Sequence, residues 1–326
     1  MTNSPLPRID LDPKLKRLLL PYSRFVEGKI WKDKSGLHTI GCIDIEDLKS
    51  LNKLVEKEKP TLSIQDPPYN FVAFKETDTN EFITWCNKWV DNIYSLMADD
   101  SAFYVWLGAD QKNGFSPLPE FMQMMKKKEF KSKSFITLRN QRGYGTQKNW
   151  MSIRQELLYY EKGNPNFNIK AEYTDIPKIL NGYYKNINGK KTENFERSKS
   201  ENIRAGNIWV DIQQVFYRME ENVNGCFAQK PLKAIERIVN AGSNKSDIVV
   251  DFFSHSGTTL IVCEKLERKC FTSDIDPIFC EITLRRLENF RKTGKTGWQN
   301  SNPFTEEIKK DKKLRSYLKK EYDINY

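Results

Sequence analysis

The chain has 326 residues, of which 38% are hydrophobic and 29% are charged, which is enough to bury the core of one large domain with an insertion or of two smaller domains. A mean hydropathy of -0.67 and the absence of an apolar run near membrane-spanning length argue against a transmembrane segment. Residues 1–10 lack the basic start and apolar stretch of a secretory signal, so a cytoplasmic protein is expected.

The net charge is +10, which is compatible with a polyanionic partner, although a solvated lysine-rich surface would give the same balance. Six cysteines show no close paired spacing, and only two histidines accompany them. We therefore expect buried free thiols and no metal site.

The first half of the chain alternates between strand and helix patterns after an N-terminal extension, 1–37, that holds a short amphipathic piece. This alternation predicts an α/β fold with a doubly wound, mostly parallel sheet. The predicted strands cover 38–45, 62–64, 102–107, 135–138 and 156–160, and the predicted helices cover 46–57, 80–97 and 119–128. Trp85 and Trp89, on one side of the second helix, are expected to belong to the core.

The strand at 62–64 leads into Asp66, Pro67, Pro68, Tyr69 and Asn70. Each proline fixes its own φ and restricts the residue before it, so this stretch predicts a rigid, non-helical turn at the carboxyl end of a strand. That edge is where open α/β sheets place their ligands. Asp-Pro-Pro is also ordinary turn material, so the stretch alone does not establish an active site.

Residues 163–225 differ in composition, because asparagine, lysine, tyrosine and glutamate dominate and the segment Asn188–Lys191 carries a turn signal. Strand and helix patterns return after Phe227. The predicted helices cover 232–239, 258–265 and 279–290, the predicted strands cover 247–253 and 270–274, and a surface helix is expected over 305–320.

Two stretches together, Asp66–Asn70 and Asp251–Thr259, resemble motifs of the S-adenosylmethionine-dependent amino-methyltransferases of DNA. In that family a D-P-P-Y loop follows one strand and a D-x-F-x-G-S-G-T-T turn follows another, and the order found here resembles the permuted β group. The resemblance implies a Rossmann-like methyltransferase fold with an inserted target-recognition region. It divides the chain into the catalytic half 38–162, the recognition region 163–225, the cofactor half 226–291 and a charged tail 292–326.

The resemblance implies an enzyme that transfers a methyl group from S-adenosylmethionine to an exocyclic amine of a base flipped out of double-stranded DNA. Asp66 and the Pro67 carbonyl would accept the two amine hydrogens, Pro68 would stiffen the loop, and Tyr69 would stack on the base. In the family an aspartate in the first position usually accompanies N6 of adenine, so adenine is expected, with N4 of cytosine as the alternative.

The cofactor turn needs small residues, which Ser254, Ser256 and Gly257 supply. Asp274 lies 274 − 251 = 23 positions beyond Asp251, close to the spacing at which dinucleotide sites place a ribose-binding acid. Asp276 is the alternative for that role. The further cofactor residues implied by the resemblance are Asp44, Lys230, Asp251, Phe253 and Thr258. The family's first glycine is replaced by His255, which could crowd the cofactor or could simply point to solvent.

The candidate DNA contacts lie in a basic and aromatic stretch, 139–150, and in the recognition region. They are Arg139, Arg142, Lys148, Lys190 and Lys191. A plain solvated loop and a flexible linker are the alternatives for these two segments. The expected partners are double-stranded DNA and a cognate restriction endonuclease, and the protein would be a monomer or a homodimer.

Two other functions compete with the methyltransferase. A DNA-binding protein that has lost catalysis is supported only by His255, and cofactor binding would separate it from the enzyme. A nicotinamide-dependent dehydrogenase shares the strand, turn and acid pattern, but the chain lacks the G-x-G-x-x-G turn and the D-P-P-Y loop would remain unexplained.

Overall fold

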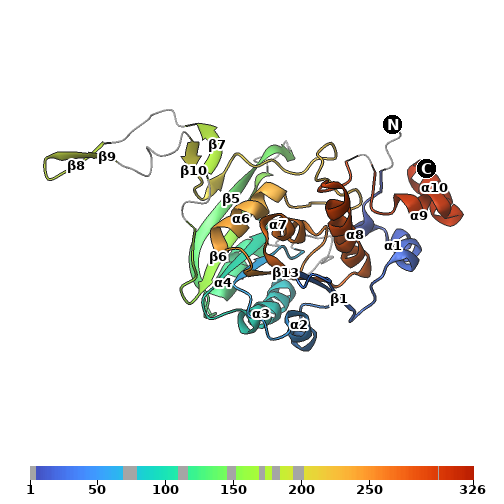
Figure 1. Cartoon of the computed structure of the whole chain (residues 1–326), viewed down its shortest axis with the longest axis horizontal. Coiled ribbons are helices and arrows are strands. Elements are labelled where there is room, and N and C mark those ends of the chain that lie inside the picture. Colours follow the sequence, from blue (N-terminus) through green and yellow to red (C-terminus); the bar gives the residue numbers. More distant parts are fainter. Residues whose placement is uncertain are drawn as a thin grey trace.

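A nine-stranded sheet lies at the centre of the computed structural model, which describes residues 5–68, 79–108, 117–144, 152–168, 173–177, 184–193, 202–299 and 301–326 (Figure 1). The strand order is β1-β2-β13-β12-β3-β4-β6-β5-β11. The five strands from β2 to β4 in this order run parallel, and β6 is antiparallel to both of its neighbours. The bounds are β1 Ile30–Lys32, β2 His38–Cys42, β3 Leu62–Gln65, β4 Ser101–Leu107, β5 Lys131–Tyr144, β6 Ser152–Lys162, β11 Ile208–Trp209, β12 Ile248–Asp251 and β13 Lys269–Asp274.

Helices cover both faces of this sheet, which explains why β2, β3, β4 and β12 are buried along their whole length. On one face lie α6 (Leu232–Gly242), α7 (Thr258–Leu266) and α8 (Pro277–Thr293), and on the other lie α2 (Leu48–Val55), α3 (Thr79–Leu96) and α4 (Pro117–Met125). Two separate apolar clusters result, one for each face. The expected doubly wound, mostly parallel sheet is confirmed.

The hairpin of β5 and β6 is longer than the sequence predicts, because the ladder continues past the buried part of the sheet. Arg139 pairs with Arg154 and Tyr144 with Ser152, so the first part of the predicted loop 139–150 is strand. These residues are polar, and backbone pairing rather than an apolar pattern keeps them extended. The prediction of a loop over all of 139–150 is therefore wrong for 139–144.

The segment inserted between β6 and α6 contains two small sheets. In the first, β7 (Tyr173–Pro177) pairs with β10 (Asn202–Arg204). In the second, β8 (Tyr184–Ile187) and β9 (Lys190–Glu193) form a hairpin that stands away from the main body (Figure 1). Asn188 and Gly189 have φ values of 53° and 76°, as a two-residue hairpin turn requires, which confirms the predicted turn.

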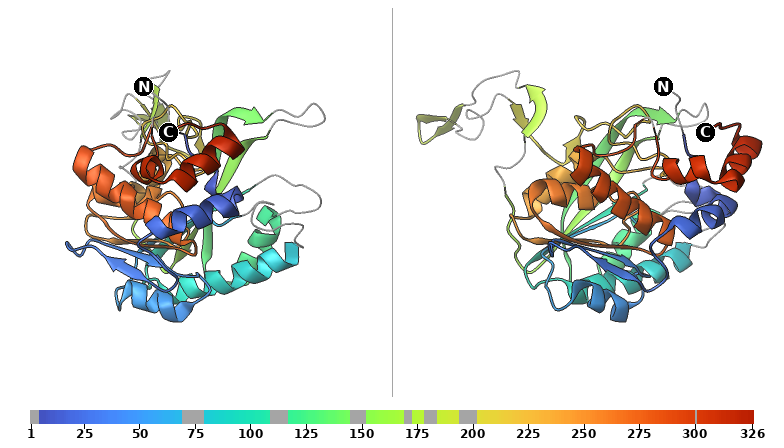
Figure 2. Two further views of the ribbon diagram at one scale, coloured as in Figure 1. Left: turned by 90° about the vertical axis from the view of Figure 1, so that its right-hand side faces the viewer. Right: turned by 45° about the vertical axis from the view of Figure 1, so that its right-hand side comes forward.

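The two ends of the chain pack together against α8. The N-terminal elements η1 (Ile9–Leu11), α1 (Pro13–Leu19) and η2 (Leu20–Tyr22) share an apolar cluster with α9 (Thr305–Lys310) and α10 (Lys312–Tyr322). Figure 2 shows these segments side by side in both views. Asp311 caps α10 by accepting hydrogen bonds from two backbone N–H groups, so the helix predicted over 305–320 is divided into two.

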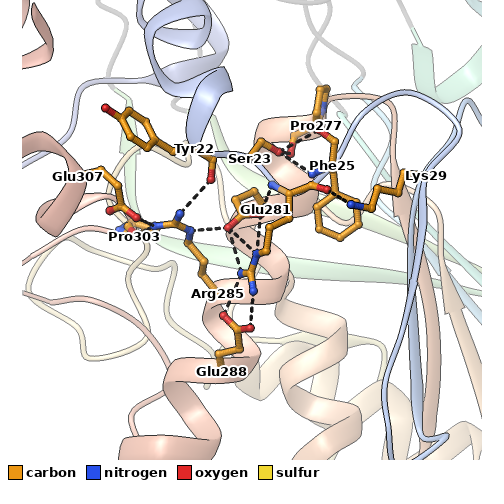
Figure 3. A network of polar contacts seen from close by, with 11 residues as sticks. Tyr22, Ser23, Phe25, Lys29, Pro277, Glu281, Arg285, Glu288, Pro303 and Glu307 are labelled. Carbon is orange, nitrogen blue, oxygen red and sulfur yellow. Dashed lines mark hydrogen bonds and ion pairs between the residues drawn. The ribbon is translucent and has the colours of Figure 1, made fainter. Parts of the chain in front are cut away.

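An ion-pair network centred on the buried Glu281 fixes this arrangement (Figure 3). The carboxylate of Glu281, which has no exposed surface, accepts hydrogen bonds from Nε of Arg285 at 2.6 Å and from Nε of Arg24 at 3.1 Å. Arg285 also donates to Glu307 at 2.7 Å, and Arg24 donates to Glu288. The network joins η2, α8 and α9, and it thereby holds the N-terminal segment in place.

None of the helices in the described ranges combines the length and the apolar character needed to cross a bilayer.

Candidate active site

A cavity of about 540 Å³ opens where the carboxyl ends of β2, β3, β12 and β13 meet. This volume lies within the range of small-molecule sites, roughly 300–1,000 Å³. Aromatic rings and charged side chains share its walls. The rings are those of Trp85, Phe227, Phe252, Phe253 and Phe279, and the charged residues are Arg8, Asp10, Lys16, Asp44, Glu46, Asp66, Lys230, Asp274 and Asp276.

Asp66 follows β3 directly and lies in the cavity wall with Pro67 and Pro68. Its Oδ2 accepts a hydrogen bond from Nζ of Lys230 at 2.7 Å, and 27% of its side chain remains exposed. Burial raises the pKa of the Asp66 carboxyl, and the Lys230 ammonium opposes this shift. Tyr69, the fourth residue of the predicted catalytic loop, lies outside the described residues.

Gln65 ties the loop after β3 to the turn after β12. This buried side chain accepts a hydrogen bond from the backbone N–H of Phe252 at 3.0 Å and donates to Ser63 and to the Val250 carbonyl. The two loops that carry the predicted catalytic and cofactor residues are therefore fixed relative to one another.

The turn from Ser254 to Gly257 is held from beneath by Arg286, a fully buried guanidinium. Its NH1 donates to the Ser256 carbonyl at 2.9 Å and to the Thr258 hydroxyl at 3.1 Å. Gly257 has φ 74°, and a Cβ added there would lie 3.0 Å from the side chain of Thr283. Only glycine fits this position without strain.

Asp251 holds the start of the same turn. Its carboxylate accepts hydrogen bonds from the backbone N–H of Phe253 at 3.0 Å and from the hydroxyl of Thr259 at 2.6 Å. Burial raises the pKa of Asp251 to about 7, against the effect of these two bonds.

His255 adopts φ 45°, so the replacement of the expected glycine keeps a left-handed backbone. Its backbone N–H donates to Oδ2 of Asp274 at 2.9 Å, and its ring lies 4.7 Å from the ring of Phe279. Burial lowers the pKa of His255 to about 4, so the imidazole is neutral at pH 7. The side chain lines the cavity. It therefore does not simply point to bulk solvent, which was one of the two interpretations of the sequence.

Asp274 ends β13 and faces the cavity. Its Oδ1 accepts a hydrogen bond from the backbone N–H of Asp276 at 2.9 Å, and burial raises its pKa to about 7. The Asp276 carboxylate caps α8 through Ile278 and forms an ion pair with Lys16 at 2.5 Å. Both oxygens of each carboxylate have a partner, but only Asp276 pairs with a cation, whereas Asp274 accepts from two backbone N–H groups.

Asp44 lies in the loop after β2, where its Oδ1 accepts a hydrogen bond from the backbone N–H of Glu46 at 2.9 Å. The strand predicted over 38–45 ends at Cys42, and this earlier end brings Asp44 to the cavity rather than into the sheet. The structure thus brings Asp44, Asp66, Lys230 and Asp274 around one cavity.

The N-terminal wall of the cavity was not predicted. The guanidinium of Arg8 lies 3.7 Å from the centroid of the Phe227 ring, and Arg8 also pairs with Asp10. Lys16 reaches the cavity from α1. These residues are more than 200 positions from their partners in the cofactor half, and no local pattern marks them. Trp85, expected in the core, also lines the cavity, 5.7 Å from Phe253, whereas Trp89 is fully buried.

Two of the candidate DNA contacts, Arg139 and Lys190, have described side chains, and neither lines the cavity. Arg139 is exposed on β5, and Lys190 is exposed beside the tip of the β8–β9 hairpin. Lys148 lies outside the described residues, as do the side chains of Arg142 and Lys191.

The family model and the curated relatives that match this chain agree on one family. Residues 61–285 match the family model described as DNA methylase. The chain is 29% identical over 271 residues to the type II methyltransferase M1.MboII of Moraxella bovis, which covers 77% of this chain and 97% of that protein. It is 27% identical over 251 residues to the DNA adenine methyltransferase YhdJ of Escherichia coli (strain K12), which covers 72% of this chain and 79% of that protein.

Among solved structures, PvuII DNA methyltransferase (cytosine-N4-specific) aligns with a TM-score of 0.55 at 15% identity, over 76% of this chain and 85% of that one. At this identity the likeness concerns the fold, and it agrees with the doubly wound sheet described above.

Proposed function

The chain belongs to the DNA methylase family, and from this premise we propose that it transfers a methyl group from S-adenosylmethionine to N6 of adenine in double-stranded DNA. The observation that carries this proposal is the position of Asp66, whose partly exposed carboxylate faces the same cavity as the turn after β12. A base amine and a methyl donor could therefore meet in one cavity.

The residues of the cavity fit S-adenosylmethionine. The six carboxylates and three cations that line the cavity give it a formal charge of 3 − 6 = −3 when all are ionised. The methyl donor carries a sulfonium, an ammonium and one carboxylate, so its net charge of about +1 complements the cavity. The aromatic walls suit the adenine ring and the sulfonium.

Within this cavity Asp274 would accept hydrogen bonds from the ribose hydroxyls, and the turn from Ser254 to Gly257 would lie along the methionine part. Asp44, which follows the strand paired with β13, would hold a further polar group of the cofactor. When bound, S-adenosylmethionine supplies an electrophilic methyl group, so that a nitrogen–carbon bond forms while the carbon–sulfur bond breaks.

Asp66 prepares the amine for this reaction. The exocyclic amine of adenine is a poor nucleophile because its lone pair is delocalised into the ring. Asp66 and the Pro67 carbonyl would each accept one amine hydrogen, which orients the lone pair and concentrates electron density on nitrogen. The methylated nitrogen then loses one proton, and because the cationic nitrogen is a strong acid, a hydrogen-bonded carboxylate or water is a sufficient acceptor.

The target base must leave the duplex, because its amine is otherwise engaged in pairing. We propose Tyr69 as the residue that stacks on the extruded base. The inserted region 163–225, with the β8–β9 hairpin and Lys190, is proposed to contact DNA outside the target base, together with Arg139. The relatives named type II methyltransferases support a cognate restriction endonuclease as a partner.

The test is to incubate the protein with unmethylated plasmid and isotope-labelled S-adenosylmethionine and to identify the labelled nucleoside after digestion. Label in N6-methyladenine supports the proposal. Label in N4-methylcytosine overturns the choice of base and keeps the family. Absence of label together with absence of cofactor binding would instead support a DNA-binding protein without catalysis.

A further inference from the structure

We propose that Lys230 is a positioning residue for Asp66, holding one oxygen of its carboxylate so that the other is directed to the target amine. This inference rests on the proposed function, because it assigns Asp66 to the amine. It differs from the cofactor-binding role that the sequence suggested for Lys230.

The contact between Lys230 and Asp66 is short, and the Lys230 side chain is held in place by its surroundings. Nζ of Lys230 lies 2.7 Å from Oδ2 of Asp66, and the Lys230 side chain is 6% exposed. The ammonium also lies 5.3 Å from the centroid of the Trp106 ring, at cation–π distance. The Lys230 carbonyl accepts a hydrogen bond from the Thr258 hydroxyl at 3.4 Å, and the next residue, Pro231, is the N-cap of α6. Both ends of the lysine are thereby restrained.

Asp66 needs such an anchor. The terminal torsion of an aspartate side chain is broad, so a carboxylate on a loop does not by itself aim an oxygen. Once Oδ2 is committed to Lys230, rotation of the carboxylate is restricted. Among the described residues no hydrogen-bond donor to Oδ1 is found, so Oδ1 is the acceptor that they leave for a ligand. Small errors in the aim of an acceptor cost much of the catalytic advantage.

The positive charge of Lys230 also affects the protonation of Asp66. Asp251 and His255 line a small pocket together with the pair, Asp274 lies in the wall of the larger cavity, and the neutral imidazole offers no compensating charge. Burial raises the pKa of Asp66, and Lys230 is the cation that opposes this. Without the ammonium, the pKa of Asp66 would be higher, and a protonated carboxyl is a poorer acceptor for an amine hydrogen.

The test compares K230M, K230Q and K230R with the wild type, and K233M serves as a matched control. Lys233 is the second residue of α6 and pairs with Asp211 at 3.5 Å, outside the cavity lining. Single-turnover methylation at saturating DNA and S-adenosylmethionine is measured from pH 6 to 9, with cofactor affinity by calorimetry and Tm for each variant.

We expect K230M and K230Q to lose about tenfold or more in rate at pH 7 and to shift the acid limb upward by about one pH unit, the effect of removing a close opposite charge. Their rates should recover at high pH, and their cofactor affinity should stay within about threefold of the wild type. K230R should keep the wild-type limb, since it keeps the charge, and K233M should keep the whole profile.

Three outcomes would overturn the inference. A weakened cofactor affinity with an unchanged pH limb would return Lys230 to cofactor binding. A loss that is equal at all pH values in both neutral variants, at unchanged Tm, would remove the positioning role. Wild-type rates in K230M would show that the ion pair has no part in the reaction. A wild-type protein that labels no DNA would be a failure of the proposed function instead, and it is seen before any variant is made.

Discussion

Replacing Asp274 by asparagine should separate the charge of this residue from its shape. The substitution keeps one oxygen that can accept the backbone N–H of His255, but it places an amide NH₂ beside the backbone N–H of Asp276 and removes the carboxylate that would bind the ribose hydroxyls. A hydrogen bond to a charged group contributes about 2 kcal/mol, so we expect S-adenosylmethionine to bind D274N roughly thirty-fold more weakly at pH 8.

The same residue predicts how affinity depends on pH. Burial raises the pKa of Asp274 to about 7, so about one-tenth of the carboxyl is ionised at pH 6 and about nine-tenths at pH 8. Because the ionised form is the better acceptor, the wild-type affinity should rise about tenfold from pH 6 to pH 8. Asp251, with a pKa of about 7, titrates in the same range, but its oxygens are held by Phe253 and Thr259.

Isothermal titration calorimetry with S-adenosylmethionine at pH 6, 7 and 8 measures both effects. D247N is the control, since Asp247 accepts a hydrogen bond from the Asn244 backbone N–H in a loop away from the cavity. D274N should lose most of the pH dependence, and D247N should keep it. A D274N variant with the wild-type slope would refute the assignment, as would a wild-type affinity that is equal at pH 6 and pH 8.

Three further substitutions test other parts of the site. D66N should lower the methylation rate in a single-turnover assay by a factor of about 10²–10³. Its affinity for S-adenosylmethionine, measured by calorimetry, should stay within a few-fold of the wild type. Full activity would contradict the role of the carboxylate. G257A should destabilise the protein by about 2 kcal/mol and weaken the cofactor, because alanine is strained at φ 74°; an unchanged Tm would argue against that backbone. E281Q should lower the free energy of unfolding by about 2–3 kcal/mol, because two arginines lose a buried carboxylate. Limited proteolysis should then cleave the variant within residues 5–24 sooner than the wild type. An unchanged cleavage rate would show that apolar contacts alone hold this segment.

Local patterns predicted the parts of the fold that local interactions determine. The strand before Asp66 and the strand that ends at Asp251 are short apolar runs that stop at turn residues, and both lie where expected. The N-cap at Asp311 carries a local signal as well, and it would have divided the last helix correctly. Strand β1 has only three residues and is defined by its pairing with β2, which no pattern within it reveals.

The candidate site was predicted where it is built from motifs and missed where it depends on distant contacts. Asp66 and Asp274 follow from the ends of β3 and β13, and Gly257 follows from the turn of small residues before α7. The pairing of Lys230 with Asp66 spans 164 positions, and that of Lys16 with Asp276 spans 260. Such contacts are set by the packing of whole elements, so a single sequence gives no evidence for them.

The joining of the two chain ends has a consequence for synthesis on the ribosome. Asp12, beside the wall that holds Arg8 and Lys16, accepts a hydrogen bond from the hydroxyl of Tyr322, 310 positions later. At about 5–20 residues per second, roughly 15–60 s separate the translation of these two residues. Until the last helix leaves the exit tunnel, the N-terminal segment lacks its packing partners. A nascent chain should therefore be unable to retain the methyl donor until residues 305–322 have left the exit tunnel.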